Sequence, residues 1–280
     1  MFLFGTNLKM HQTPAQTAAF VWALRERLLQ LPYRDELILW VAPPYTSIQA
    51  AAEAAHGAPI WVGAQNMHWA DEGAFTGEIS PHMLKACGAQ FVMLGHVERR
   101  TLFGETDELV HQKVLAAARH NLKVMLCVGE PRAVKEAGAG DEYVAQQLKL
   151  ALRGFDRCET LFILYEPVWS VGVGGVSADP ADVSRAMDNI RGVLQQLYGS
   201  SGEAVPLLYG GSADEANCAH YARLPQAAGM GVGRAGLSPE RFWAVLTEAL
   251  AARMCSVGSV HARDCSPARD ASTAKNLGSL

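Results

Sequence analysis

The sequence predicts a single α/β domain built as a closed (β/α)8 barrel. Short apolar runs alternate with helix-like segments eight times along the chain. Each repeat takes roughly 30 residues, the length of one parallel strand with its right-handed helical crossover. The 280 residues, 49% of them hydrophobic and 19% charged, suffice for one large core. Eight such units close into a barrel.

The clearest predicted strand is Leu161–Tyr165. It is short, continuously apolar and followed closely by Pro167, which cannot extend a central ladder, so we expect it to be buried on both faces. Every run is followed by a polar residue, a glycine or a proline. In chain order the predicted strands are Phe2–Gly5, Leu37–Ala42, Ile60–Ala64, Phe91–Leu94, Val124–Val128, Leu161–Tyr165, Val205–Tyr209 and Met230–Val232.

Capping signals and helical periodicity place the helices between these strands. Thr13-Pro14 supplies a cap and a first-turn proline for a helix to about Leu31. Phe20, Leu24 and Leu28, spaced at i, i+4 and i+8, mark its buried face. Further helices are predicted after Pro44, after Ser80-Pro81, over Thr106–His120, in the segment that ends at about Arg153, and after Asp179-Pro180. A last helix at the end of the barrel has Phe242, Val245, Leu246 and Ala249 on its inner face.

Two segments fall outside this pattern. Residues 65–79 form a polar loop that is long for a strand-to-helix connection and carries Trp69 and Phe75, so we expect it to pack against something. From about Arg253 the chain is rich in serine, alanine and small polar residues and has no helical or strand period. We therefore predict a barrel domain over residues 1–252 and a mobile tail over 253–280.

Composition excludes several classes of function. The net charge of −4, with no basic run, argues against nucleic-acid binding. Six scattered cysteines without a Cys-x-x-Cys pair indicate reduced thiols rather than a zinc or redox motif. No apolar stretch reaches about 18 residues and the N-terminus lacks signal-peptide features, so we expect a soluble, cytoplasmic protein without a membrane partner. A doubly wound, nucleotide-binding sheet would need G-x-G-x-x-G after the first strand, which Gly5-Thr6-Asn7 does not provide.

Polar residues at the predicted strand ends would share the C-terminal rim, where the active site of a parallel barrel is built. Singly they are weak signals, because a lone histidine is often structural, a lysine solvated, a glycine a turn, and a glutamate before proline a surface carboxylate. Together they supply a base, a neutral donor, a cation and phosphate-binding amides. Those groups suit proton transfer between adjacent carbons of an anionic carbonyl compound. The rim residues are Asn7, Lys9, His96, Glu166, Ser212 and Gly233.

Six ordered motifs carry a resemblance to the triosephosphate isomerase family. They are N-x-K-M at Asn7–Met10, L-G-H-x-E-R-R at Leu94–Arg100, G-E-T-D at Gly104–Asp107, C-V-G-E at Cys127–Glu130, Y-E-P-V-W at Tyr165–Trp169 and Y-G-G-S at Tyr209–Ser212. The resemblance implies a TIM barrel that interconverts dihydroxyacetone phosphate and glyceraldehyde 3-phosphate, as in glycolysis and gluconeogenesis. It implies a small phosphorylated sugar as substrate and neither a metal nor an organic cofactor.

The resemblance also assigns roles to individual residues. It implies Glu166 as the base and His96 as a neutral electrophile, a pairing that is the family's own known mechanism. Lys9 and Asn7 would supply charge and a hydrogen bond, and Glu98 would position Lys9. It further implies that Arg99 pairs with Glu105 and that Cys127 is a packed neighbour rather than a nucleophile.

Two loops take their expected roles from the same resemblance. Residues 167–177 look like the family's mobile lid, whose closure excludes water. Closure would bring the Gly172 amide onto the phosphate beside the amides of Ser212, Gly233 and residue 234. The loop over residues 65–79, with Thr76, is similar to the family's dimer loop, so the resemblance implies a homodimer.

The sequence departs from the family pattern at several positions. Leu8 and Val97 replace the usual tryptophan and serine, and the lid sequence over 172–176 is altered. Arg234 stands where a second glycine usually cradles the phosphate, so its side chain either pushes the anion out or contributes a guanidinium. Retention of Gly172, Ser212 and Gly233 favours the guanidinium role.

These departures leave two alternatives open. A divergent branch of the family isomerises four-carbon ketose phosphates such as L-erythrulose 1-phosphate, and Arg234 with the altered lid suggests such a pocket. A catalytically silent barrel that binds a phosphorylated ligand is the other alternative. The intact set of Asn7, Lys9, His96 and Glu166 counts against that second reading.

Overall fold

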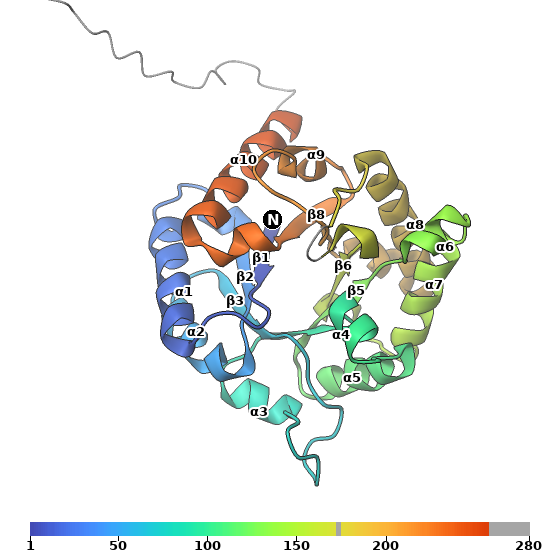
Figure 1. The fold of residues 1–280 in the computed structure, drawn as a ribbon, viewed down its shortest axis with the longest axis horizontal. Coiled ribbons are helices and arrows are strands. Elements are labelled where there is room, and N and C mark those ends of the chain that lie inside the picture. Colours follow the sequence, from blue (N-terminus) through green and yellow to red (C-terminus); the bar gives the residue numbers. More distant parts are fainter. Residues whose placement is uncertain (172–174, 258–280) are drawn as a thin grey trace, which may run out of the picture.

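The computed structural model describes residues 1–171 and 175–257. Eight parallel strands close into one barrel in chain order, with β8 pairing back onto β1 (Figure 1). The predicted (β/α)8 barrel is therefore confirmed. The strands are β1 (Phe2–Asn7), β2 (Leu37–Ala42), β3 (Ile60–Ala64), β4 (Phe91–Leu94), β5 (Lys123–Val128), β6 (Leu161–Tyr165), β7 (Leu207–Tyr209) and β8 (Ala227–Val232).

Three strands differ from their predicted bounds by two residues or more, and β5 begins one residue early, at Lys123. β1 continues from Gly5 to Asn7, because Thr6 and Asn7 stay in register with β2. β7 begins at Leu207 rather than Val205, since Pro206 has no N–H to donate to a ladder. β8 begins at Ala227 rather than Met230, because the small residues 227–229 do not form the run of large apolar side chains that indicates a strand. A Cβ at Gly229 would lie 1.9 Å from the Leu3 carbonyl oxygen, so β8 passes β1 closely there.

The helices form a ring outside the strands (Figure 1). The predicted cap at Asp179 is present, because its side chain accepts from the amide of Ala181 at 2.8 Å, and Thr106 likewise caps α5 by accepting from the amide of Leu109 at 3.3 Å. The α-helices are α1 (Pro14–Leu29), α2 (Ile48–Ala55), α3 (Pro81–Ala86), α4 (Val97–Leu102), α5 (Asp107–Arg119), α6 (Arg132–Glu136), α7 (Gly140–Ala151), α8 (Pro180–Tyr198), α9 (Cys218–Ala222) and α10 (Pro239–Val257). Short 3-10 helices are η1 (Arg34–Glu36), η2 (Tyr45–Ser47), η3 (Cys158–Thr160), η4 (Val168–Ser170), η5 (Gly199–Ala204) and η6 (Arg234–Leu237).

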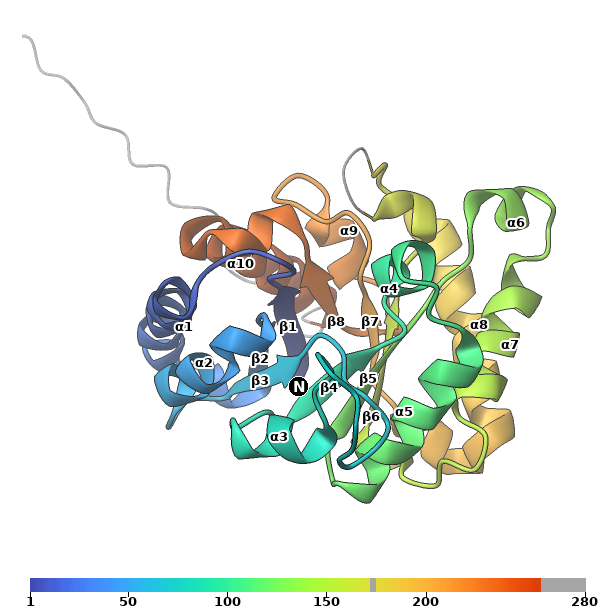
Figure 2. The ribbon, with the colours of Figure 1, turned by 60° about the horizontal axis from the view of Figure 1, so that its bottom comes forward.

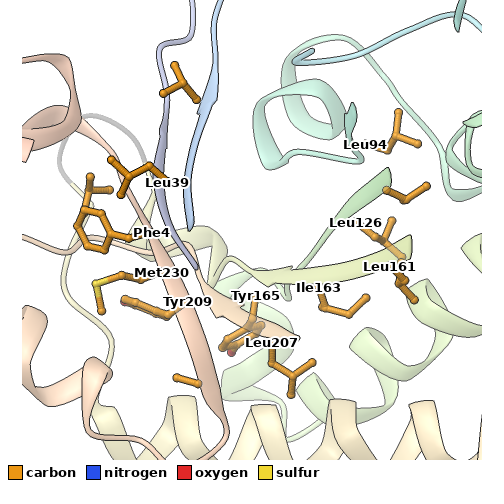
Figure 3. Packing of buried hydrophobic residues seen from close by; sticks show 14 of the residues in the cluster. Phe4, Leu39, Leu94, Leu126, Leu161, Ile163, Tyr165, Leu207, Tyr209 and Met230 are labelled. Carbon is orange, nitrogen blue, oxygen red and sulfur yellow. The ribbon is translucent and has the colours of Figure 1, made fainter. Parts of the chain in front are cut away.

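The hydrophobic core has two layers. The larger lies between strands and helices, where Phe242 of α10 meets Phe4 of β1 and Phe20 of α1 edge-on, at centroid distances of 5.0 and 6.1 Å. Figure 3 shows part of this layer, with Phe4, Tyr209 and Met230 from neighbouring strands grouped together. This layer fixes the helices against the barrel.

A second cluster fills the barrel interior and includes Trp40 and Phe91, which pack edge-on at 6.2 Å. The Trp40 ring fits because its neighbours on β1 and β8 are glycines. A Cβ at Gly5 would lie 2.2 Å from Trp40 Cδ2, and one at Gly231 2.9 Å from Trp40 Cζ2. The interior is thus a packed floor beneath the C-terminal rim rather than a channel.

Two further segments complete the fold. The loop over residues 65–79 projects away from the barrel before α3 (Figure 1), and residues 71–78 are all exposed. At the C-terminus α10 continues over residues 253–257, the first part of the predicted tail, and the rest of that tail, residues 258–280, lies outside the described residues. In the described ranges no helix is both long and apolar enough to cross a bilayer.

Candidate active site

A pocket of about 500 Å³ opens at the C-terminal ends of the strands. In Figure 2, α4 and the segment joining β7 to α9 lie along this same edge. The predicted residues that line the pocket are Asn7, Lys9, His96, Glu98, Glu166, Ser212, Gly233 and Arg234. Cys127 is buried beside the pocket instead of lining it, and Gly172 lies outside the described residues. Side chains from five strand ends thus share one cavity.

The carboxylate of Glu166 lies against the His96 imidazole. Glu166 Oε1 is 3.2 Å from His96 Nε2, and the two residues are only 4% and 5% exposed. The other carboxylate oxygen accepts a long hydrogen bond, 3.4 Å, from the backbone N–H of Val97. A carboxylate and an imidazole therefore meet at the pocket wall, largely out of water.

His96 is held in one tautomer by the helix that it caps. Its Nδ1 accepts from the backbone N–H of Glu98 at 3.2 Å, at the start of α4. That bond uses the Nδ1 lone pair, so the proton of a neutral ring resides on Nε2, facing Glu166. Burial, the largest single influence, lowers the pKa of His96, but the carboxylates of Glu166 and Glu98 together raise it by more, so the net direction is upward.

This balance depends on Glu166 remaining a close anion. If Glu166 gains a proton or turns toward a ligand, its raising effect on the pKa of His96 falls away. Burial and the partial positive charge of the α4 N-terminus, which both disfavour a charged ring, are then opposed by the weaker effect of the Glu98 carboxylate. The site can thus present a neutral N–H donor at Nε2.

Two glycines make room for Glu166. A Cβ at Gly129 would lie 1.9 Å from the Glu166 carbonyl oxygen, and one at Gly210 would lie 2.9 Å from Glu166 Cγ. The Glu166 backbone N–H donates to Val128 O at 2.8 Å, which ties the residue to the end of β5. Glu166 is therefore wedged between the strand ends on either side of β6.

Cys127 is a buried neighbour of this carboxylate. It is 1% exposed, and burial, together with the charge of Glu166, raises the pKa of its thiol well above the usual range. A thiol in that state stays protonated and is a poor nucleophile. Its geometry fits the expected packing role.

Lys9 is fixed at both its side chain and its backbone. Its Nζ lies 2.6 Å from Glu98 Oε1, and its backbone has a left-handed φ of 50°. The side chain of Asn7 accepts from the Lys9 N–H at 2.8 Å, and Gln65 donates to the Lys9 carbonyl at 2.9 Å. A strained backbone held by such bonds is typical of functional positions.

The expected pairing of Arg99 with Glu105 is only part of a larger cluster. Arg99 Nε lies 3.9 Å from Glu105 Oε1, but the buried Lys113 ammonium is the closer partner of that carboxylate. Lys113 also donates to Asn66 at 2.8 Å. The cluster joins α5 to the base of the 65–79 loop, so Lys113 is the structural partner that the sequence did not reveal.

The residues expected to bind an anion, Ser212, Gly233 and Arg234, also line the pocket. The Ser212 backbone N–H points at the Ser170 hydroxyl, 2.8 Å away. Gly233 is exposed, and a Cβ there would meet nothing within 4 Å. Arg234 is exposed at the start of η6 and lines the pocket, as does Arg241, whose guanidinium is paired with Glu215 at 3.1 Å.

Several residues that shape the site were not singled out from sequence. Gly129 and Gly210 belong to quoted motifs, so their steric role could have been suspected. Gln65 and Ser170 carry no sequence signal, because each acts through hydrogen bonds to segments distant along the chain.

Comparisons with known proteins agree with this geometry. A family model described as triosephosphate isomerase matches residues 2–249. The chain is 40% identical to a triosephosphate isomerase of Synechococcus sp. (strain JA-2-3B'a(2-13)) over 244 residues, 86% of this chain and 94% of that protein. It is 39% identical to an L-erythrulose-1-phosphate isomerase of Rhizobium etli over 251 residues, 89% and 92% of the two chains. The crystal structure of triosephosphate isomerase from Bartonella henselae superposes with a TM-score of 0.79 at 30% identity, covering 88% of this chain and 98% of that one.

Proposed function

The chain belongs to the triosephosphate isomerase family, and from this premise we propose that it interconverts dihydroxyacetone phosphate and glyceraldehyde 3-phosphate. The observation that carries the proposal is the 3.2 Å contact between Glu166 and His96 in a pocket that Lys9 and Asn7 also line. A carboxylate beside an N–H donor is what enediolate chemistry needs.

In the proposed mechanism Glu166 removes a proton from the carbon next to the substrate carbonyl. His96 donates from Nε2 to the carbonyl oxygen, which requires the neutral tautomer favoured by its Nδ1 bond to the α4 N-terminus. Lys9 stabilises the negative charge that develops, while Asn7 hydrogen-bonds the reacting end. Glu98 is the positioning residue for Lys9, at 2.6 Å. The protonated Glu166 then returns its proton to the neighbouring carbon, while His96 Nε2 gives its proton to the former carbonyl oxygen and takes up the hydroxyl proton of the first carbon, so that the new carbonyl forms there. No metal or organic cofactor enters the proposal.

We assign the phosphate to the other end of the pocket. Backbone amides at Ser212, Gly233 and Arg234 surround it, and the exposed backbone at Gly233 lets an anion approach closely. The Arg234 guanidinium would add a charge-assisted bond. The contribution expected of Gly172 concerns a residue outside those described.

A second candidate substrate is a four-carbon ketose phosphate, L-erythrulose 1-phosphate. Arg234 favours it, because a long cation replaces the glycine expected from the family. Relatives named L-erythrulose-1-phosphate isomerase are 39% and 36% identical to the chain, close to the 40% of relatives named triosephosphate isomerase. The residues proposed for catalysis would be the same for both substrates.

Steady-state kinetics on both substrates tests the proposal. We expect kcat/KM for glyceraldehyde 3-phosphate to approach the diffusional ceiling of about 10⁸ M⁻¹s⁻¹ and to exceed that for L-erythrulose 1-phosphate. Arg234→Gly should then leave this preference intact. A strong preference for the tetrulose, lost in Arg234→Gly but kept in Arg241→Ala, would transfer the assignment to the second candidate and make Arg234 the specificity residue.

We also propose that the protein acts as a homodimer through the 65–79 loop. Residues 71–78 are exposed on a projecting loop, and Phe75 is 45% exposed although it packs on His68. An ordered loop with an exposed aromatic ring suits burial against a second copy. The loop also begins at Gln65, which bonds Lys9, so its docking would support the site.

A further inference from the structure

The Ser212 amide at the pocket wall already has an acceptor from within the chain. Its N–H donates to Ser170 Oγ at 2.8 Å, and the same hydroxyl lies 3.2 Å from the Tyr209 hydroxyl. Ser170 is 1% exposed, so this contact is shielded from water. The serine comes from η4, directly after β6, whereas the amide comes from the turn after β7.

A serine oxygen at this distance sits where an oxygen of a bound anion would sit. A backbone N–H makes one good hydrogen bond, so it cannot serve Ser170 and an incoming phosphate at full strength together. We propose that the Ser170 hydroxyl is an internal competitor for the Ser212 amide, which a phosphate must displace in order to bind. This inference depends on the proposed function at one point, because it takes the Ser212 amide to be part of the phosphate subsite.

The surroundings leave this hydroxyl little freedom. A Cβ at Gly211 would lie 2.6 Å from Ser170 Oγ and 2.3 Å from the Tyr209 hydroxyl, so both oxygens press against the turn that carries the amide. The Tyr209 ring stacks on Tyr221 at 4.0 Å, which holds the Tyr209 hydroxyl in place. The serine therefore stays near the amide unless something takes its place.

Displacement is not prohibitively costly, because Ser170 keeps a second partner. Once phosphate has taken the amide, the serine hydroxyl can still bond the Tyr209 hydroxyl. The penalty is one neutral hydrogen bond, exchanged for a charge-assisted one to the anion. The apparent phosphate Kd thus equals the intrinsic Kd divided by the fraction of molecules in which the Ser212 amide is free of Ser170.

Calorimetric binding of inorganic phosphate to the full chain tests the competition. Ser170→Ala removes the competitor and leaves the amide open, so its phosphate Kd should be roughly two- to tenfold lower than that of wild type. Ser47→Ala, at a fully buried serine in η2 that does not line the pocket, should leave Kd unchanged. An unchanged or weaker Kd in Ser170→Ala, or no phosphate binding in either protein, would overturn the inference.

A second variant separates competition from a general loosening of the loop. Tyr209→Phe removes the partner that the displaced Ser170 hydroxyl would keep but leaves the bond to the Ser212 amide, so its phosphate Kd should be roughly two- to tenfold higher than that of wild type. Tightening in Tyr209→Phe equal to that in Ser170→Ala would contradict competition.

Turnover gives an independent readout. With a phosphorylated substrate, Ser170→Ala should lower KM by the same factor as the phosphate Kd and leave kcat unchanged, the pattern of added uniform binding. A fall in kcat with KM unchanged would show a different role for the serine and overturn the inference. Inactivity of the wild type toward both sugar phosphates would refute the proposed function. The phosphate titration would still decide whether Ser170 competes for the Ser212 amide.

Discussion

Glu166 is the residue on which the proposed chemistry depends. Its carboxylate accepts from the His96 ring N–H and from a backbone amide. A glutamine keeps the size of the side chain and can still accept one of these two bonds, and the loss of the other is offset because no charge is buried. Glu166→Gln therefore removes the basic group while keeping the shape of the site. We expect kcat/KM to fall by about two to four orders of magnitude with the melting temperature unchanged, measured by coupled assay and thermal unfolding.

Glu166→Asp is the companion variant, since it keeps the charge but withdraws the carboxylate from the reacting carbon. It should be impaired but more active than Glu166→Gln. Retention of wild-type turnover in Glu166→Gln would remove this residue from the chemistry, whatever the substrate.

The position of a site residue could be predicted from sequence where it depends only on the direction of the strand that precedes it. Glu166 and His96 each follow a buried apolar run, and a parallel barrel brings all such positions to one rim. The contact between Ser170 and Ser212 could not be predicted, because the two residues come from successive strand-to-helix segments whose spacing depends on side-chain packing. The same holds for Lys113, which looks like a solvated helix cation in sequence but is 4% exposed.

The buried carboxyl of Glu130 should make the stability of the protein depend on pH. It is 5% exposed, and burial raises the pKa of its carboxyl although the Tyr165 hydroxyl donates to it at 3.0 Å. A carboxyl whose pKa is raised on folding stabilises the fold at pH values below its unfolded pKa. That contribution is lost as pH rises through the folded pKa. Ionised Glu130 thus costs stability at neutral pH.

Glu130→Gln should accordingly raise the melting temperature at pH 7 to 8, with a gain that shrinks toward zero as the buffer becomes acidic. The amide oxygen can still accept from Tyr165. Asp182→Asn provides a control of opposite sign, because hydrogen bonding to Lys135 lowers the pKa of Asp182. That variant should lose stability at neutral pH and regain it relative to wild type in acid. Equal, pH-independent shifts in both variants would refute the electrostatic argument.

At the scale of elements, the fit between β5, β6 and β7 around Glu166 depends on glycine. The Cβ of Gly129→Ala would collide with the Glu166 carbonyl, which is backbone and cannot rotate away. We expect a loss of about 1–3 kcal/mol of unfolding free energy, a fall in melting temperature of roughly 3–10 °C, and reduced kcat. Gly192→Ala, in the middle of α8 with nothing within 4 Å of its Cβ, should instead gain about 0.5–1 kcal/mol. Loss of stability in both would point to a general effect of alanine rather than to the collision.

Long helices were predictable from sequence, whereas among the helices of six residues or fewer only α3 was, because Ser80-Pro81 marks its start. α1, α5, α8 and α10 follow caps or periodic apolar faces, and Phe242, Val245, Leu246 and Ala249 are all fully buried as predicted. α4 has only six residues, and its N-cap is His96, whose ring nitrogen rather than a hydroxyl accepts the capping bond. Neither its length nor its composition indicates a helix. That missed helix is the element that fixes the tautomer of His96.

The closure of the whole sheet into a barrel could be predicted from the number of strands. Eight parallel strands with helical crossovers have no edge left once β8 meets β1, so the number of apolar runs was enough to predict the barrel. The shape of the pocket was not predictable. It depends on Trp40 lying across the barrel interior, which two glycines from other strands permit. Because the sequence does not reveal this packing, it left trioses and tetruloses both open as substrates.

We predict that the protein is a homodimer in solution. Light scattering at micromolar concentration should report twice the chain mass of 30.2 kDa. Phe75→Glu places a charge on the exposed tip of the 65–79 loop and should shift the mass to that of one chain. The control Leu197→Glu alters a comparably exposed apolar residue on α8, at 38% against 45%, and should remain dimeric. Because Gln65 at the root of this loop bonds the Lys9 carbonyl, the Phe75→Glu monomer should also lose kcat, as the backbone that presents Lys9 loosens. A wild-type monomer, or a Phe75→Glu protein that stays dimeric, would contradict the assignment of this loop to the interface.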